Sequence, residues 1–479
     1  AEEARTNIVY GNYQEPATLD PNNMGDGAGF IVASNIYEAL LWITDDLQIE
    51  PLLAHSWDIS EDGLVYTFYL EEDVTFHNGE HFTANDCKFT YDRAMEGGYA
   101  GSVTGIIDST EVIDDYTFQV TLKYPYSPAL ECFASHFLRI VNEKAVTEAG
   151  DSFSYNPIGA GTGPYEFVSW SSGNNIILRA YEDYWRGPAS IKDVEIRFIT
   201  DTTALAMAIE TGEVDYGPIN VRDIPTFESN PDLDYAVVPS TIVNYIGFNT
   251  QAEPFTDARV RQAIAYCLDK EEMLLVSMDG YEGGTLTATP VPSTGFGCNL
   301  DLEIYPRDVE KAKELLAEAG YADGFSTTIY TPNAIWRRNI ATYLQACMAE
   351  IGITANIEVM EQAAILEEIR AGNCPIFIMG FTGTSGDADF FYYSQYHTGQ
   401  TYNYDKYENA ELDALPDQAR QSSDSEERIA LYKQISEIVY NEVPDIPTFM
   451  INMLYGNNSA LECSYAPFTR TYIYDFSWT

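Results

Sequence analysis

The segment from Pro51 to Cys87 constrains the fold more than any other part of this chain. Asp62-Gly63 predicts a turn, after which the apolar residues at 64, 66, 68 and 70 alternate with their neighbours. Alternation with a period of two is typical of a strand that buries one face. A shorter strand is expected at Val74–Phe76. The segment therefore predicts two successive strands.

The end of the same segment predicts a hairpin turn followed by a helix. Asn78-Gly79 is the strongest two-residue hairpin signal, because both residues tolerate the left-handed backbone of such turns. Thr83 can cap a helix that runs through Asp86 and Tyr91. A strand, a turn and a capped helix are thus expected in close succession.

A metal motif also overlaps this turn. His77-Asn78-Gly79-Glu80-His81 fits the H-x-x-E-H string of the inverted zinc peptidases. That chemistry requires both histidines on one helical face, whereas Asn-Gly opposes a helix. We therefore expect a hairpin with one packed and one exposed histidine, and no bound metal.

As a whole, the segment closely resembles the signature of the family 5 solute-binding proteins, the extracytoplasmic receptors of peptide, nickel and related ABC importers. So many fixed residue types at fixed spacing are highly specific. The matching positions are Pro51, Leu53-Ala54, Trp57, Asp62-Gly63, Tyr66, Phe68, Leu70, Val74, Phe76-His77, Gly79, Thr83-Ala84 and Asp86.

Two later segments carry the same resemblance. Gly159–Tyr165, GAGTGPY, could be mistaken for a phosphate-binding loop, but no Lys-Ser/Thr pair follows and Pro164 leads into a strand. It resembles instead the G-T-G-P-Y turn of the family. From Val243, a strand gives way to a helix capped near Thr256, and this block resembles the one that opens the second lobe of the family.

Length and charge limit the possible partners. A chain of 479 residues exceeds the size at which one core keeps growing, so at least two lobes are expected. The 25 basic and 74 acidic residues give 25 − 74 = −49, which repels nucleic acid and anionic lipid headgroups. No run approaches the roughly 18 apolar residues of a membrane helix. The polar start, AEEARTN, is interpreted as a tether that follows a removed signal sequence.

The resemblance implies an α/β fold of the two-lobed periplasmic-binding-protein type, class II or cluster C. The first lobe is expected at residues 1–240, including an extra subdomain at about 45–165, and the second at 241–450. The tail, 451–479, is expected to return to the first lobe. The crossings between the lobes should lie near Thr241 and Met450. A ligand is expected between the lobes, since domain interfaces commonly form such sites.

One candidate ligand site is the segment Thr331–Arg338, which is interpreted as a loop leading into a helix. In dipeptide-binding relatives a similar segment supplies an arginine that holds the peptide carboxylate. Arg338 matches this arginine best and Arg337 is second, and Trp336 lies beside them. A guanidinium suits a carboxylate because it can bind both oxygens. The alternative is a pair of surface arginines that neutralise nearby acids.

The other candidate is the loop that begins at Gly380. Peptide-binding relatives commonly carry a G-W-x-x-D pattern here, whose aspartate receives the α-ammonium group. In this chain Phe381 replaces the tryptophan and Thr384 replaces that aspartate, which puts ordinary capture of free-amine peptides in doubt. Asp387 and Asp389 match a later part of the pattern, and either a ligand role or a purely structural role is open to them. Two aromatic residues are also expected to contact the ligand: Phe390, which follows this loop, and Tyr245, which is expected to flank the cleft.

These observations predict a binding protein without catalytic residues, cofactor or metal. The expected ligand is a short peptide or peptide-like carboxylate, delivered to an ABC permease. An oligosaccharide or a metal chelate is the alternative ligand within this class. An extracellular hydrolase is the alternative class, but the chain lacks G-x-S-x-G and a helical H-E-x-x-H. We expect a monomer outside the cytoplasm, periplasmic or on the cell surface, with no membrane contact except an N-terminal lipid anchor.

Overall fold

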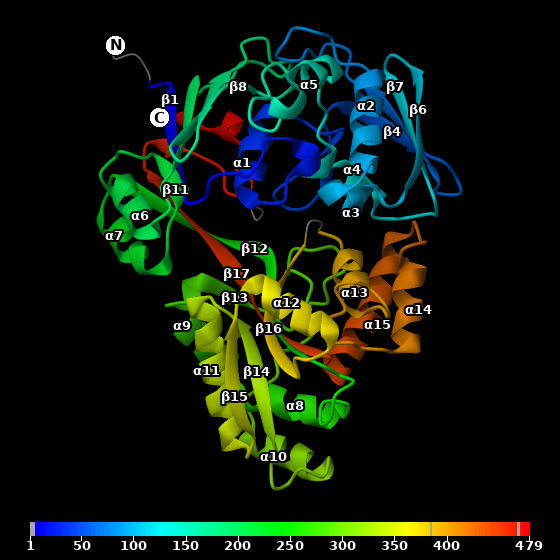
Figure 1. Cartoon of the computed structure of the whole chain (residues 1–479), viewed down its shortest axis with the longest axis vertical. Coiled ribbons are helices and arrows are strands. Elements are labelled where there is room, and N and C mark those ends of the chain that lie inside the picture. Colours follow the sequence, from blue (N-terminus) through cyan, green and yellow to red (C-terminus); the bar gives the residue numbers. More distant parts are fainter. Residues whose placement is uncertain (1–4, 384–385, 467–469) are drawn as a thin grey trace. The chain divides into compact units, whose positions relative to one another are not determined.

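The chain divides into two compact units. Unit 1 comprises Ala1–Val238 and Leu454–Thr479, and unit 2 comprises Pro239–Met453. The computed structural model describes residues 5–383, 386–466 and 470–479. Two long strands, β12 (Leu233–Phe248) and β17 (Asp445–Asn458), each run from one unit into the other (Figure 1).

The main sheet of unit 1 has the order β17-β11-β1-β10-β9-β8. β1 pairs in parallel with β10 and β11, whereas the remaining pairs are antiparallel. Its strands are β1 (Asn7–Asn12), β8 (Tyr165–Ser171), β9 (Asn175–Ala180), β10 (Asp193–Phe198) and β11 (Tyr216–Pro218). The helices of unit 1 are α1 (Gly27–Ile36), α2 (Ala84–Met95), α3 (Gly101–Thr104), α4 (Ala129–Phe133), α5 (Glu143–Ala149), α6 (Thr202–Glu210) and α7 (Ile224–Ser229).

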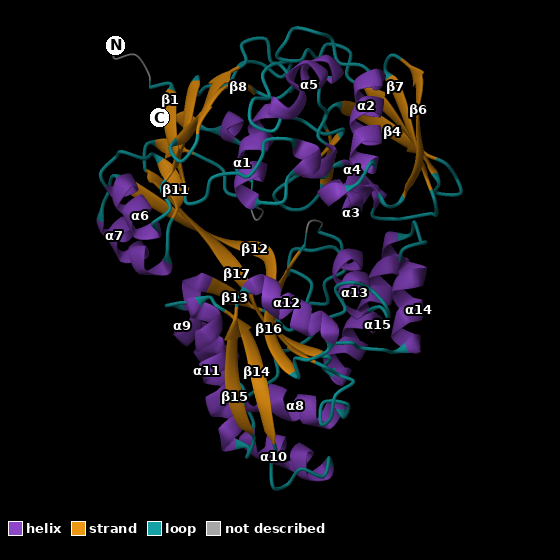
Figure 2. Ribbon diagram, in the orientation of Figure 1, coloured by secondary structure: helices purple, strands orange, loops and turns teal. Residues whose placement is uncertain are grey.

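A second sheet in unit 1 has the order β4-β5-β7-β6 and is covered by α2 (Figure 2). Its strands are β4 (Ala54–Ile59), β5 (Val65–Leu70), β6 (Ile107–Asp114) and β7 (Thr117–Leu122). The strand predicted from the alternation at 64–70 is confirmed as β5, and Tyr66, Phe68 and Leu70 are buried in the core of this sheet. Four short strands complete unit 1: β2 (Leu41–Ile43), β3 (Ile49–Pro51), β18 (Leu461–Glu462) and β19 (Ser477–Trp478).

The turn predicted at Asn78-Gly79 is confirmed. Gly79 has φ +82°, and the Phe76 amide donates to the Glu80 carbonyl at 2.8 Å. The expected strand at Val74–Phe76 is reduced to an isolated bridge between Thr75 and His81. His77 is half-buried, with Nε2 2.8 Å from the Gly163 carbonyl, and burial lowers its pKa to about 4. The two histidines therefore lie on a turn and share no helical face.

The glycine-rich turn near Gly161 serves close packing. A Cβ on Gly161 would lie 2.0 Å from the Ile36 carbonyl oxygen, and one on Gly163 would lie 2.7 Å from the Ile36 carbonyl carbon. Only glycine allows the two backbones to approach so closely. The segment thus packs closely against the end of α1, and this packing explains its glycines.

The core of unit 2 is a sheet with the order β15-β14-β16-β12-β17, to which β13 adds beside β17. β14 runs parallel to both β15 and β16, whereas β12 and β16 are antiparallel. The additional strands are β13 (Gly284–Leu286), β14 (Ser326–Pro332), β15 (Thr354–Met360) and β16 (Ile376–Thr382). Together with its helices, this mixed sheet confirms the predicted α/β class.

The helices of unit 2 surround this sheet, and α11 and α12 pack on its parallel strands (Figure 2). In the described part of the chain, no helix is long and apolar enough to cross a bilayer. The helices are α8 (Ala258–Cys267), α9 (Lys270–Ser277), α10 (Val309–Glu318), α11 (Ile335–Glu350), α12 (Gln362–Ala371), α13 (Ala388–Tyr396), α14 (Ala410–Ala419) and α15 (Ser425–Glu442).

Candidate ligand-binding site

The parallel strands of unit 2 bring several site residues to one edge of the sheet. β14 and β15 end in register, with Pro332 opposite Met360. The chain then turns into α11 after β14 and into α12 after β15. Ligands of open α/β sheets bind at the carboxyl ends of such strands, where helices begin. This edge carries Arg337 on the first turn of α11 and Gln362 at the start of α12.

Arg337 lies over the neighbouring indole, with its guanidinium carbon 4.7 Å from the Trp336 ring centre. Its Nη1 donates to Oε1 of Gln362 at 3.0 Å. Its Nε is buried and has no hydrogen-bond partner. Burial lowers the pKa of Arg337, and the Tyr245 phenol opposes that shift. The side chain therefore retains unused donor capacity at the strand edge.

No carboxylate of the described residues forms an ion pair with Arg337. This isolation is unusual in a chain with 74 acidic and 25 basic residues. Other desolvated arginines of unit 2 have acidic neighbours, as Arg428 has Asp387 and Arg420 has Asp389. A guanidinium that is partly removed from water and lacks a counter-charge favours an incoming anion.

Arg338 differs from its neighbour in burial, although each arginine donates to a side-chain amide oxygen. It is exposed, and its Nη1 donates to Oδ1 of Asn333 at 3.2 Å. Asn333 in turn donates to the Glu361 carboxylate at 3.1 Å. The sequence ranks Arg338 first, whereas this geometry favours Arg337. A ligand role for either residue stays a prediction.

The two aspartates after β16 are held inside unit 2. Asp387 caps α13 and accepts bonds of 2.8 and 2.7 Å from Nη2 of Arg428 and one of 3.2 Å from the Tyr432 hydroxyl. Asp389 is 1% exposed and lies 3.3 Å from Nε of Arg420. Of the two roles left open by the sequence, these contacts account for the structural one. Thr384 lies outside the described residues.

The predicted aromatic residues divide into buried and accessible groups. Tyr245 and Phe381 are buried, and their rings pack on Phe377 and Phe391. Phe390 is half-buried, with its ring centre 5.3 Å from that of Phe381. Trp336, also half-buried, carries the guanidinium of Arg337. Trp336 and Phe390 thus have surface to offer a ligand, whereas Tyr245 and Phe381 form the layer beneath.

Sequence reasoning missed two residues that shape this site. Gln362 binds Arg337, and a Cβ on Gly380 would lie 3.3 Å from Nη2 of Arg337. The available signal was position, because Gln362 closely follows residues 353–359, whose alternation is typical of a strand. Gly380 lies in β16, opposite Asn244 of β12. A Cβ here would crowd Nη2, so the glycine lets the guanidinium lie close to β16.

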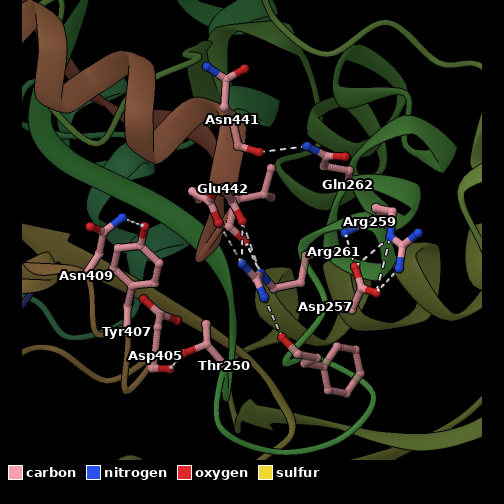
Figure 3. Close-up of polar contacts among 12 residues, drawn as sticks. Thr250, Asp257, Arg259, Arg261, Gln262, Asp405, Tyr407, Asn409, Asn441 and Glu442 are labelled. Carbon is pink, nitrogen blue, oxygen red and sulfur yellow. Dashed lines mark hydrogen bonds and ion pairs between the residues drawn. The ribbon is translucent and has the colours of Figure 1, made fainter. Parts of the chain in front are cut away.

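Unit 2 contains another desolvated arginine, Arg261 of α8, which is 2% exposed (Figure 3). Its guanidinium donates to the carbonyls of Phe255 at 2.5 Å, Val443 at 2.8 Å, and Glu442 at 2.5 and 3.2 Å. These bonds join α8 to the end of α15. Each nitrogen of the Arg261 guanidinium therefore has a backbone acceptor, which gives this side chain a structural role.

The chain is similar to extracellular binding proteins over most of its length. It matches the family "Bacterial extracellular solute-binding proteins, family 5 Middle" over residues 48–403. It is 31% identical to heme-binding protein A of Haemophilus influenzae, covering 92% of this chain and 86% of that protein. It is 28% identical to the glutathione-binding protein GsiB of Salmonella paratyphi A, covering 93% and 89% of the two chains.

A solved structure extends the likeness to the fold. The ABC transporter-associated periplasmic binding protein DppA from Helicobacter pylori, in complex with the peptide STSA, superposes with a TM-score of 0.82. The identity is 28%, and the match covers 99% of this chain and 98% of that chain. The predicted periplasmic-binding-protein fold is thereby confirmed.

Proposed function

Because this chain belongs to family 5 of the bacterial extracellular solute-binding proteins, we propose that it captures a short peptide or peptide-like carboxylate for an ABC importer. Proteins of this family act outside the cytoplasm and bind solutes. The peptide complex of DppA and the name of the glutathione-binding relative support a peptide-like ligand. The chain's own support is the uncompensated guanidinium of Arg337 at the carboxyl edge of β14.

In this proposal Arg337 binds a carboxylate of the ligand. Its Nε is buried without a partner, and its other neighbours are the neutral Gln362 and the Trp336 ring. A carboxylate would accept from guanidinium N–H groups that Gln362 leaves unused and would supply the counter-charge that Arg337 lacks. Trp336 and Phe390 would add apolar contact, because aromatic side chains bury large areas at low entropic cost. Arg338 is the second choice for this role.

The proposal also includes movement of two lobes around the ligand. The first lobe would be residues 1–240, with the extra subdomain at about 45–165, the second 241–450, and the tail 451–479. The hinge positions would be Thr241 and Met450. The passage of β12 and β17 between the units supports this division. Hinged closure around a ligand is a common means of capture in binding proteins.

Catalysis is absent from the proposed function. The protein would bind its ligand unchanged and pass it to the permease as a monomer held at the membrane by an N-terminal lipid anchor. The anchor and the monomeric state rest on the family resemblance alone. A hydrolase is the competing class, and incubation with peptides and glycosides followed by product analysis separates the two classes.

A ligand screen tests the function. Native mass spectrometry of the protein as purified would identify a retained ligand, and melting curves with a panel of peptides would rank affinities. We expect peptide carboxylates to raise the melting temperature, because a ligand that binds only the folded state stabilises it. Stabilisation by neutral oligosaccharides or metal chelates, with no response to any carboxylate, would contradict the proposal.

A further inference from the structure

The partner of Arg337 is neutral although an acid lies next to it in the chain. Gln362 directs Oε1 to Arg337 Nη1 at 3.0 Å, and its Nε2 lies 3.9 Å from Sδ of Met379. Glu361, one residue earlier, instead binds Asn333 at 3.1 Å. The carboxylate of Glu361 therefore bonds to Asn333, which contacts the exposed Arg338. The amide of Gln362 bonds to the desolvated Arg337.

A glutamate has nearly the shape of glutamine, so the amide at position 362 has a chemical consequence. A carboxylate at 3.0 Å from a guanidinium would form a charge-assisted pair and occupy the arginine. The amide oxygen accepts one hydrogen bond and fixes the side chain, but it leaves the positive charge intact. A glutamine at position 362 thus orients Arg337 without neutralising its positive charge.

The surroundings reinforce this separation. Gly380 presents no side chain to Nη2, and the Trp336 ring supports the guanidinium face without contributing a charge. Among the described residues, the phenol of Tyr245 is the ionisable neighbour of Arg337, and it keeps its proton because burial raises its pKa well above its usual value. A neutral phenol leaves the guanidinium cationic.

We propose that Gln362 sets the charge selectivity of the ligand site by holding Arg337 in place without neutralising it. This inference rests on the proposed binding of a ligand carboxylate by Arg337. Gln362 acts through the arginine and is a positioning residue. The ligands selected are those that present a carboxylate, and ligands with an amide at the same place are rejected.

The test compares each peptide with its own C-terminal amide. Di- to tetrapeptides, including Ser-Thr-Ser-Ala, are titrated by calorimetry as carboxylate and amide pairs. The unaltered protein, Gln362→Glu and Gln362→Met are compared. Gln434→Glu makes the same substitution on the exposed face of α15 and serves as the matched control. Gln362 is exposed, so all variants are expected to keep the melting temperature of the unaltered protein.

We expect the unaltered protein and Gln434→Glu to favour the carboxylate over the amide by at least about tenfold. Gln362→Glu should bring this ratio close to one, because its own carboxylate occupies Arg337. Gln362→Met should keep a preference for the carboxylate, since it adds no charge. Loss of affinity that is equal for both members of a pair is the signature of a merely structural role.

The outcomes separate the inference from the function beneath it. A carboxylate preference that survives in Gln362→Glu, while Arg337→Met abolishes it, overturns the inference and leaves the proposed function standing. Binding of no carboxylate in the panel by the unaltered protein overturns both.

Discussion

Two desolvated arginines of unit 2 have opposite surroundings. Arg261 donates to three backbone carbonyls, and Glu442 adds a carboxylate at 4.0 Å. Arg337 has one neutral side-chain acceptor and a buried Nε without a partner. Burial lowers the pKa of both groups. Desolvation alone therefore does not mark a ligand site; the unused hydrogen-bonding capacity does.

The difference follows from where each arginine lies in the sheet architecture. Arg261 is within α8, and its side chain reaches the end of α15, where helix carbonyls lack intrahelical partners. Arg337 is at the start of α11, where helix amides lack partners and carbonyls do not. A guanidinium finds acceptors at a helix end and few at a helix start. The start of a helix therefore leaves a guanidinium with unused donors that an anionic ligand can accept from.

The largest effect that tests this comparison is expected from Arg261→Met. Its loss would leave the buried bonds to the carbonyls of Phe255 and Val443, and the partly buried bonds to that of Glu442, without their donor. We expect the free energy of unfolding to fall by about 3–5 kcal/mol, as when a buried pair is broken. Chemical denaturation measures this change. A variant with unaltered stability would show that Arg261 is not the link between α8 and α15.

Arg337→Met should have the opposite effect to Arg261→Met. The free energy of unfolding should change little, whereas affinity for the ligand should fall. We expect the binding free energy of a carboxylate ligand to weaken by about 2–5 kcal/mol, the usual loss for a desolvated charge pair. The melting temperature without ligand should change little, because Arg337 has no buried acid to leave unpaired. Arg338→Met is the matched control and is expected to bind normally. Equal losses in both variants would contradict the distinction between the two arginines.

The aspartates after β16 allow a prediction about ligand amines. Asp387 and Asp389 are paired with Arg428 and Arg420, and a threonine stands at 384. Peptides with a free amine should therefore bind with nearly the same affinity as their N-acetylated forms. Thr384→Asp should favour the free amine by up to about 2 kcal/mol, the lower range for a desolvated pair. Sub-micromolar binding of free dipeptides that N-acetylation abolishes in the unaltered protein would show that another acid receives the amine.

A smaller, pH-dependent effect is expected near Arg261. Burial raises the pKa of Asp445 to about 7 and that of Asp405 well above its usual value. A carboxyl whose pKa is higher in the folded than in the unfolded state stabilises the fold fully below its unfolded pKa, which is near 4. This stabilisation is lost as the pH rises toward 7. Asp445→Asn should reduce this loss, so its melting temperature should gain a few degrees on the unaltered protein between pH 4 and 7.

Two neighbours of Asp445 also affect this pH dependence. Burial lowers the pKa of Lys270 to about 7, so its own penalty is relieved only as pH rises above 7. Tyr396 donates to Asp445 at 2.8 Å and should still bond an asparagine. A variant whose pH profile parallels that of the unaltered protein would show that Asp445 does not hold its proton when folded.

The smallest effect is expected from Gly380→Ala. The new Cβ would lie 3.3 Å from Nη2 of Arg337, closer than an ordinary contact. The guanidinium must shift by a few tenths of an ångström, and we expect binding to weaken by no more than about 1 kcal/mol. Calorimetry detects such a change, and Gly101→Ala, where a Cβ meets open space and φ is not positive, controls for loss of a glycine. Stronger binding would mean that Nη2 does not need its present position.

The sequence predicted the fold better than the site, for physical reasons. The alternation at 64–70 predicted β5 because one face of its sheet is buried. Arg337 and Arg338 were both identified, but neighbours on a helix point about 100° apart. Which of them meets Gln362 and Gly380 depends on how β15 and β16 lie beside β14. The partners of Asp387 and Asp389 lie on later segments, and no local pattern could reveal those pairs.

The most direct test of the central claim is a crystal structure of the protein with the ligand that it retains on purification. We predict a carboxylate of that ligand within hydrogen-bond distance of the Arg337 guanidinium, with Gln362 still bound to Nη1. A bound ligand that leaves Arg337 without a new acceptor would contradict the claim.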